Sequence, residues 1–489
     1  MNHDGRNRKP ACLRAAALLL CFWAAGLGAQ ERFRRTPPDP EPLPPLRLAP
    51  VQSNVLTNGL KLGLAARLRS PLVVIHVVIL AGEAHSPPGL PSVAALTAGM
   101  IGRGTPLLTA TDLENAVDTM GASFATSVTP DTTVFTFTCL ERDVDRALGL
   151  LKTMLLEASF DEREIETVKR TLYYDRFAKG RDPEYVAQRQ LLRLLFDGHP
   201  YQVTTYTEEA VRSPARRDLE AFYSRYYRPN NAFIVVTGDF SLSAISLKVS
   251  RQFNAWIARD VERPFLPAPV PNNASRICFV DLPSTENAYI YVGNIVMPMT
   301  SPDYFAWLVL DQVLGGTTSS RLFMNLRESK SYAYYAFSET NFFRTAGVFW
   351  ARAKVTPEVV TPAVQEILND LENLAHERLP VFEMEQAKAF LIGNFPLRLE
   401  TPEELGLRAA RILTFNLGAE HWTRYLETVM LVSLERVFET SQRYLLPKPV
   451  VVIVGSGAEV VDQLREFETI EVYDSKGVRK QTIQKGVAK

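Results

Sequence analysis

The chain has 489 residues, which is too long for one ordinary hydrophobic core and suits two domains of about 200 residues each. Hydrophobic residues make up 46% and charged residues 22%, which is the balance of a soluble globular protein. The 54 basic and 54 acidic residues cancel, and no basic block is interleaved with aromatic residues. The composition therefore argues against nucleic acid as a partner.

The N-terminus has the order of a secretory signal. Basic residues among the first 14 positions precede an apolar run, AAALLLCFWAAGLGA, that is too short to span a bilayer. Small residues at its end predict cleavage near Ala29, so we expect a signal peptide at 1–29 and export of the mature chain, with the periplasm as the natural compartment. The alternative is an uncleaved membrane anchor. No later apolar run is long enough for a membrane span, so none is expected once the signal is removed.

Two proline-rich segments divide the chain. Residues 30–50 predict an extended linker, and a second linker is expected at 259–275, after which the pattern of strands and helices starts again. These segments bound an N-terminal lobe at 51–258 and a C-terminal lobe at 276–471. Residues 472–489 are polar, and we expect them to form a tail without regular structure.

The first lobe reads as a mixture of strands and helices. Runs of β-branched and apolar residues predict two strands around a polar turn within 60–82, a third strand at 134–140 and a buried strand at 231–239. Helical periodicity after a capping residue predicts a helix that ends near Gly121, and a run opened by acids predicts another at 161–179. The pattern is typical of an α/β (α+β) fold.

The two halves resemble each other. The first closes on YRPNNAFIVVTGD and the second on YLLPKPVVVIVGS, with Gly238 and Gly455 in matching places. Near the starts, Thr105 within GRGT matches Thr317 within GGT. Both pairs repeat at a period of about 215 residues, which indicates a duplicated domain. Strand-like sequence within 276–296 opens the second copy.

The cysteines do not predict a disulfide framework. Cys12 and Cys21 would leave with the signal peptide. Cys139 and Cys278 are far apart, and each lies inside a strand-like run. We therefore expect both to be buried and to behave as small hydrophobic residues.

The segment 310–339, LDQVLGGTTSSRLFMNLRESKSYAYYAFSE, carries the densest set of signals. The Gly315–Gly316 pair predicts the end of one helix, and Ser319 or Ser320 would cap the next. Helical spacing then predicts a buried stripe formed by Leu322, Phe323 and Leu326.

Arg327 lies at the edge of that stripe, and three tyrosines, Tyr332, Tyr334 and Tyr335, follow on a turn or strand. An arginine and a tyrosine that converge here could hold a peptide carbonyl through hydrogen bonds. The alternative is a surface arginine beside a core tyrosine, and the spacing alone leaves both interpretations open.

This segment resembles the C-terminal lobe of the M16 family of peptidases (pitrilysin, insulinase and mitochondrial processing peptidase). That family shows a Gly-Gly, a Ser-Arg-Leu, an Arg-Glu and then a Tyr, and its Arg and Tyr help to bind the substrate or its tetrahedral intermediate. Arg327 and Tyr334 keep the family's spacing. The resemblance therefore implies that these two residues bind the substrate or stabilise the transition state.

The resemblance covers nearly the whole exported chain. It includes the Asn58-Gly59 start, DTMGASF, HPYQVTTY, FYSRYYRPNNAFIVVTGD and the helix EMEQAKAFLIGNF. It implies two homologous lobes, each a mixed β-sheet flanked by helices.

The first lobe departs from the family at the zinc motif. Active members carry His-x-x-Glu-His on a helix, where both His bind zinc and the Glu activates water. When the following Gly-Thr is matched to Gly104-Thr105, Ala95 and Gly99 replace the two His and Ala98 replaces the base. The third ligand of the family, a Glu about 76 residues later, falls on Asp175, which is a helix-surface acid on the plainer interpretation.

A second way of matching the motif to the sequence does not restore the zinc site. A match anchored on Gly89 places the motif on Ser92, Ala95 and Leu96, which also cannot bind a metal ion. The chain has 6 histidines, and none has another three or four positions away. His76 reads as a core residue. A site assembled from His85, His199, Asp175 and Glu83 is conceivable but has none of the expected spacing.

Three functional hypotheses follow. In the first, the chain is the non-catalytic subunit of a heterodimer and supplies Arg327 and Tyr334 to a zinc-bearing M16 partner that hydrolyses unfolded peptides, so that no cofactor is expected in this chain. In the second, it is a structural or peptide-binding protein without a catalytic role. In the third, it is a stand-alone metallopeptidase with an unusual metal site.

Overall fold

The computed structural model describes residues 51–66, 70–202, 207–262, 266–270, 275–283, 285–445 and 448–485. The predicted signal peptide at 1–29 and the linker at 30–50 lie outside the described residues. Within the described part of the chain, no helix is long and apolar enough to cross a membrane.

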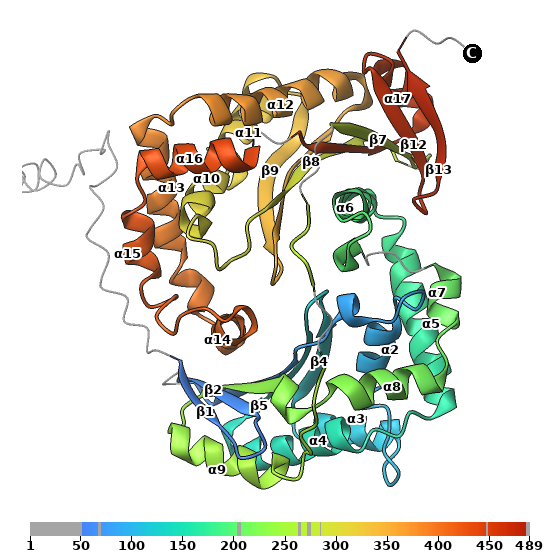
Figure 1. The fold of residues 1–489 in the computed structure, drawn as a ribbon, viewed down its shortest axis with the longest axis vertical. Coiled ribbons are helices and arrows are strands. Elements are labelled where there is room, and N and C mark those ends of the chain that lie inside the picture. The colour runs from blue at the N-terminus through green and yellow to red at the C-terminus, as the bar shows by residue number, and fades with distance from the viewer. Residues whose placement is uncertain are drawn as a thin grey trace, which may run out of the picture. The chain divides into compact units, whose positions relative to one another are not determined.

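The first half of the chain builds a mixed sheet of six strands in the order β1-β2-β6-β3-β5-β4 (Figure 1). The strands β2 and β6 are parallel, and the other neighbours are antiparallel. The strand bounds are β1 (Gln52–Val55), β2 (Lys61–Ala66), β3 (Leu72–Ile79), β4 (Ser123–Val128), β5 (Thr133–Leu140) and β6 (Ala232–Gly238). The main helices of this half are α2 (Val93–Met100), α3 (Ala110–Thr119), α4 (Val144–Leu156), α5 (Glu162–Lys179), α6 (Pro183–Leu195), α7 (Glu208–Arg212), α8 (Arg216–Tyr226) and α9 (Leu242–Phe253).

The second half repeats this plan in a sheet of seven strands, in the order β13-β12-β7-β11-β8-β10-β9. The strand bounds are β7 (Arg276–Asp281), β8 (Ala288–Val296), β9 (Ala333–Phe342), β10 (Gly347–Val355), β11 (Val450–Gly455), β12 (Thr469–Asp474) and β13 (Arg479–Gln484). The main helices are α10 (Tyr304–Gly315), α11 (Arg321–Phe323), α12 (Val360–His376), α13 (Val381–Asn394), α14 (Pro402–Phe415), α15 (Tyr425–Met430), α16 (Leu434–Leu445) and α17 (Gly457–Leu464). The order β2-β6-β3-β5-β4 in the first sheet corresponds to the order β7-β11-β8-β10-β9 in the second, so the two halves share one topology over these strands.

The strands and helices expected from the sequence are present with small shifts at their ends. The helix expected to end near Gly121 is α3, whose cap residue Thr109 accepts a hydrogen bond from the backbone of Asp112. Cys139 and Cys278 are buried free thiols, as expected. The polar tail expected at 472–489 was wrong for its described part, because those residues form the end of β12 and the strand β13.

Both faces of the first sheet are buried, because each is covered by a helix layer. On β3, alternate residues Val73, Ile75, Val77 and Ile79 enter the core formed with α2, α3, α4 and α9. The intervening residue Val78 packs with Ala409 and Ala410 of α14, which belongs to the second half of the chain. The near-continuous apolar sequence of β3 is the signature of a strand that is buried on both faces.

Each half of the chain also contributes one helix that packs on the sheet of the other half, and we call this the exchange of helices. The helix α6 of the first half packs on β8 and β11 of the second sheet, with Val186, Ala187 and Leu191 in its core (Figure 1). Close approach is possible because β8 carries Gly293, where an added Cβ would lie 2.9 Å from Leu191. The helix α14 makes the equivalent contact with β2, β3 and β6 of the first sheet. Each half therefore completes the hydrophobic core of the other.

Polar contacts between the halves accompany this exchange. On α6, Glu184 accepts hydrogen bonds from the Tyr335 hydroxyl and the Arg352 guanidinium, both at 2.7 Å. In the turn between β4 and β5, Asp131 accepts from the Tyr201 hydroxyl and from the backbone N–H of Arg344, both at 2.8 Å. The two contacts tie the exchanged helix and the hairpin turns together.

We predict that Gly406→Ala loosens α14 from the first sheet. A Cβ at Gly406 would lie 2.7 Å from the ring of His76 and from the Thr237 hydroxyl, both of which are buried. The overpacking should lower the free energy of unfolding by about 1–3 kcal/mol in urea denaturation. The matched control is Gly393→Ala on α13, where nothing lies within 4 Å of the added Cβ. A loss of equal size in both variants would contradict the packing argument.

We also predict that the fold weakens in acid through His76. Burial lowers the pKa of His76 from its usual 6.5 to about 4. Between these two pH values, His76 is protonated in the unfolded chain but neutral in the folded chain. The free energy of unfolding therefore falls as the pH drops from 6.5 towards 4. The contribution is about 3 kcal/mol when complete. Urea denaturation at several pH values should show a shallower acid slope for His76→Asn, and an unchanged slope would contradict the assignment.

Candidate functional site

The helix α2 carries the positions where the resemblance places the zinc motif. Ala95, Ala98 and Gly99 offer no side-chain ligand, and Ala98 is fully buried. The helix packs against α5 and α8 through an apolar cluster that includes Leu96 and Met100. An added Cβ at Gly99 would lie 2.6 Å from Val168 of α5. A side chain at position 99 would therefore need the Val168 side chain to shift.

Asp175, at the third ligand position, is engaged elsewhere. It lies on α5 with its side chain 48% exposed and forms an ion pair with Lys179 at 3.0 Å, one helical turn away. No group of three or more His, Cys, Asp or Glu side chains that could hold a metal ion exists among the described residues. The residues of α2 and α5 do not fit the zinc ion of active family members.

The structure does not bring together the alternative metal site that was considered for His85, His199, Asp175 and Glu83. The ring of His199 is occupied at both nitrogens, with Nε2 2.9 Å from the carbonyl of Pro267 and Nδ1 accepting from the N–H of Tyr201 at 3.0 Å. His85 Nδ1 accepts from the backbone N–H of Gly82 at 3.2 Å. Glu83 lies 3.5 Å from Arg176. These groups stabilise local structure instead of facing one another.

Arg327 and Tyr334 lie on either side of one turn at the edge of the second sheet. Arg327 belongs to a π-helical turn, η5 (Met324–Ser329), and Tyr334 lies at the start of β9. Between them, Ser331 adopts a left-handed backbone with φ of 55°. The N–H of Tyr332 donates to the carbonyl of Leu326 at 2.8 Å, which closes the turn.

Both side chains are open to solvent. Arg327 is 49% exposed, packs its guanidinium over Phe323 and has Glu328 at 3.9 Å. The Tyr334 residue is 56% exposed, and the Lys354 ammonium lies 5.2 Å from its ring. The expected buried stripe is confirmed, because Leu322, Phe323 and Leu326 are all buried. The side chains that the resemblance singles out are therefore free to meet another molecule.

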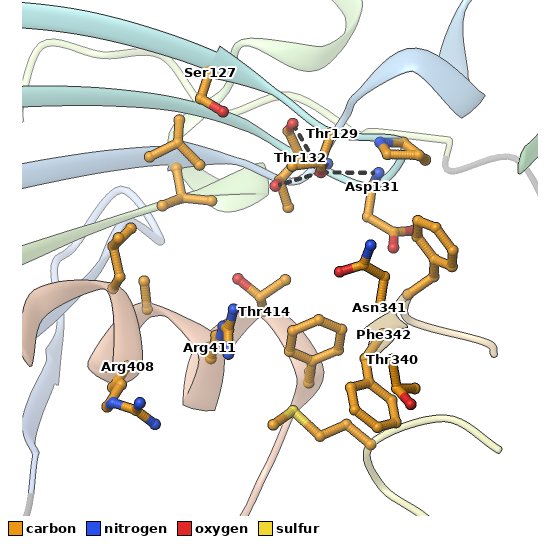
Figure 2. A pocket seen from close by; sticks show the side chains of 18 of the residues that line it. Ser127, Thr129, Asp131, Thr132, Thr340, Asn341, Phe342, Arg408, Arg411 and Thr414 are labelled. Atoms are coloured by element: carbon orange, nitrogen blue, oxygen red, sulfur yellow. Dashed lines mark hydrogen bonds between the residues drawn. The ribbon is translucent and has the colours of Figure 1, made fainter. Parts of the chain in front are cut away.

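A cavity of about 910 Å³ lies beside this strand, between the two sheets (Figure 2). One wall is the β4 strand with its turn to β5, and the opposite wall is α14 with residues 340–343 at the end of β9. Figure 2 shows Arg408, Arg411 and Thr414 along α14, across from Thr129 and Thr132. Neither Arg327 nor Tyr334 lines the cavity, although β9 runs from Tyr334 to its wall.

No sequence pattern indicated this cavity. Its wall is a polar face of α14 whose opposite face is apolar, a pattern that an ordinary surface helix shows too. The floor includes Asp131, whose pKa is raised by burial although it accepts two hydrogen bonds. The exchange of α14 between the halves creates the cavity, and an exchange of helices has no local sequence signal.

Comparison with known proteins places the chain in a family. The family model for the "Insulinase (Peptidase family M16)" matches residues 66–209, and that for the "Peptidase M16 inactive domain" matches residues 215–391. A Bacillus subtilis protein named "Uncharacterized zinc protease YmxG" is 24% identical over 350 residues, covering 70% of this chain and 83% of the relative. The Helicobacter pylori "Non-peptidase homolog YmxG" is 23% identical over 334 residues, covering 68% of this chain and 76% of the relative.

Solved structures share the fold. A structure described as the peptidase M16 inactive domain from Pseudomonas fluorescens matches with a TM-score of 0.77 at 19% identity, over 83% of this chain and 98% of that one. A protease structure from Helicobacter pylori matches with a TM-score of 0.74 at 19% identity, over 83% of this chain and 100% of that one. With both halves matched by the family's models and the two-lobed fold shared with its structures, this chain belongs to the M16 peptidase family.

Proposed function

We propose that this chain is the non-catalytic subunit of an M16-type peptidase, which holds an unfolded peptide while a zinc-bearing partner of the same family cleaves it. One observation carries the proposal. The zinc-motif positions on α2 hold Ala95, Ala98 and Gly99, which have no side-chain atom that can bind a metal ion, whereas Arg327 and Tyr334, at the positions of the family's substrate-binding pair, are exposed. A chain that retains only the second set is suited to complete a site on another chain.

The chemistry at these two side chains is hydrogen bonding to a carbonyl. The partner would supply the metal ion and its activated water, and this chain would supply donors. The Arg327 guanidinium and the Tyr334 hydroxyl can both donate to a peptide carbonyl, and such bonds strengthen as negative charge develops on its oxygen. Positioning by the rigid η5 turn would make this stabilisation available without reorganisation at the moment of reaction.

The strand β9 offers a surface along which a peptide can bind. Among the described strands, β9 forms one edge of the second sheet, whose other edge is β13, and β4 and β1 form the edges of the first sheet. An extended peptide can add to such an edge through backbone hydrogen bonds, which tolerate many sequences. A peptide paired with β9 would begin beside Tyr334 and reach the cavity at residues 340–342.

The second candidate function is peptide binding without any part in catalysis. The name of the Helicobacter pylori relative, "Non-peptidase homolog YmxG", supports this second candidate. The two candidates differ in one measurable property. A donor to the transition state changes kcat, whereas a residue that only binds the peptide changes KM.

We predict that Arg327→Ala and Tyr334→Phe each lower kcat of the assembled two-chain peptidase by roughly tenfold or more, because each removes a donor to the developing oxyanion. The measurement is steady-state cleavage of an unfolded peptide by the co-purified chains. Thermal unfolding of each variant should match that of the parent chain, since both side chains are exposed.

The matched control is Arg378→Ala, which removes an arginine that is 63% exposed, stacks on Phe438 and lies in the same half of the chain. Its rate should equal that of the parent. A change confined to KM in both test variants would favour the peptide-binding candidate, and unchanged kinetics in both would refute the role of the pair.

A further inference from the structure

Three arginines line one end of the cavity without a carboxylate partner. Arg398 lies in the short turn η7 (Leu397–Leu399), and Arg408 and Arg411 lie one turn apart on α14. In the described part of the chain, none of the three forms an ion pair within 4.0 Å. Like charges gathered in this way repel one another unless an anion lies between them.

Arg408 is fixed in place by its surroundings. Its guanidinium lies 5.2 Å from the ring centre of Phe395 and 5.1 Å from that of Trp422. The Trp422 indole N–H donates to the Arg408 carbonyl at 2.9 Å. The Nε of Arg408 is buried and has no acceptor among the described residues. A buried donor without an acceptor is unfavourable and is a feature that a bound ligand or water can correct.

The positive charges of Arg398 and Arg411 act on Arg408. The pKa of Arg408 is lowered, first by burial and then by the positive charges of Arg411 and Arg398. Glu404 on the same helix opposes this shift, but it does not approach within ion-pair distance. Glu403 also lines the cavity and forms no ion pair among the described residues.

The other acids that line the cavity are engaged elsewhere. Glu83 lies with Arg176, and Asp131 accepts hydrogen bonds from Tyr201 and from the N–H of Arg344. The end of the cavity formed by η7 and α14 therefore keeps an excess of positive charge.

We propose that Arg398, Arg408 and Arg411 bind a carboxylate of the peptide that enters the cavity. The proposal rests on the peptide-holding function proposed above and adds a preference for acidic peptides to it. The arginine fork matches the two oxygens of a carboxylate, and the rings around Arg408 hold that fork in position. The cavity volume lies at the upper end of the roughly 300–1,000 Å³ typical of small-ligand sites, so it suits a short segment of a peptide.

Two sources could supply the carboxylate, namely an Asp or Glu side chain or the C-terminus of the peptide. Both present the same chemistry to the arginines. Four fluorescent peptides of one extended sequence separate them. They carry either acidic residues or their Asn and Gln isosteres, each with a free or an amidated C-terminus.

Fluorescence anisotropy with the full chain tests the proposal. The parent chain should bind the peptides that carry the relevant carboxylate at least roughly tenfold more tightly than the fully neutral peptide. The double variant Arg398→Gln/Arg411→Gln should abolish this preference and leave the affinity for the neutral peptide unchanged. Both side chains are exposed, so the variant should fold. Loss of the preference on amidation identifies the C-terminus as the source, and loss on isosteric replacement identifies a side chain.

The matched control is Arg424→Gln/Arg465→Gln, which removes the same charge from two exposed arginines that do not line the cavity. The preference should persist in it. Equal affinity of the parent chain for acidic and neutral peptides would overturn the arginine site while leaving the peptide-holding function intact. The absence of binding to all four peptides would overturn both.

Discussion

The reciprocal exchange of α6 and α14 is the contact on which the rest of the structure depends. Each sheet has one face that its own half covers and another that would remain apolar and exposed without the helix of the other half. Burial of apolar area is the main favourable term in folding, so neither half is expected to be stable alone. Glycines at 293 and 406 allow the close approach on which the exchange depends.

The exchange of helices also explains why the cavity lies next to β9, the strand that begins beside the exposed Arg327–Tyr334 pair. It brings the polar face of α14 opposite the β4–β5 hairpin, and a cavity remains between them (Figure 2). The strand β9 leads from this cavity to the turn that carries Arg327 and Tyr334. The helix α2, in contrast, contributes Ala98, Leu96 and Met100 to apolar clusters on the other side of the first sheet from α14. One fold therefore combines a helix α2 without metal ligands with an exposed Arg327–Tyr334 pair and a cavity, which we propose bind a peptide.

Local features were predictable from the sequence because they depend on local physics. The sequences of β3, β6, β8 and β11 are apolar because both faces of those strands are buried. The helices α3 and α5 begin after the capping residues Thr109 and Asp161, which are of types that favour helix N-termini. The features that depend on distant contacts were not predictable. The exchanged helices, the cavity and its three arginines arise from pairing between segments that are far apart, and β13 reads as polar because it is an exposed edge strand.

The central claim is that this chain contributes to proteolysis only through a partner, and one measurement tests it most directly. The tagged chain is purified from its own host, and the eluate is assayed for zinc and for chelator-sensitive cleavage of unfolded peptides. We expect activity and zinc to travel with a second chain that bears His-x-x-Glu-His, and to leave this chain when the two are separated. Zinc and cleavage activity retained by the isolated chain would contradict the role of a non-catalytic subunit.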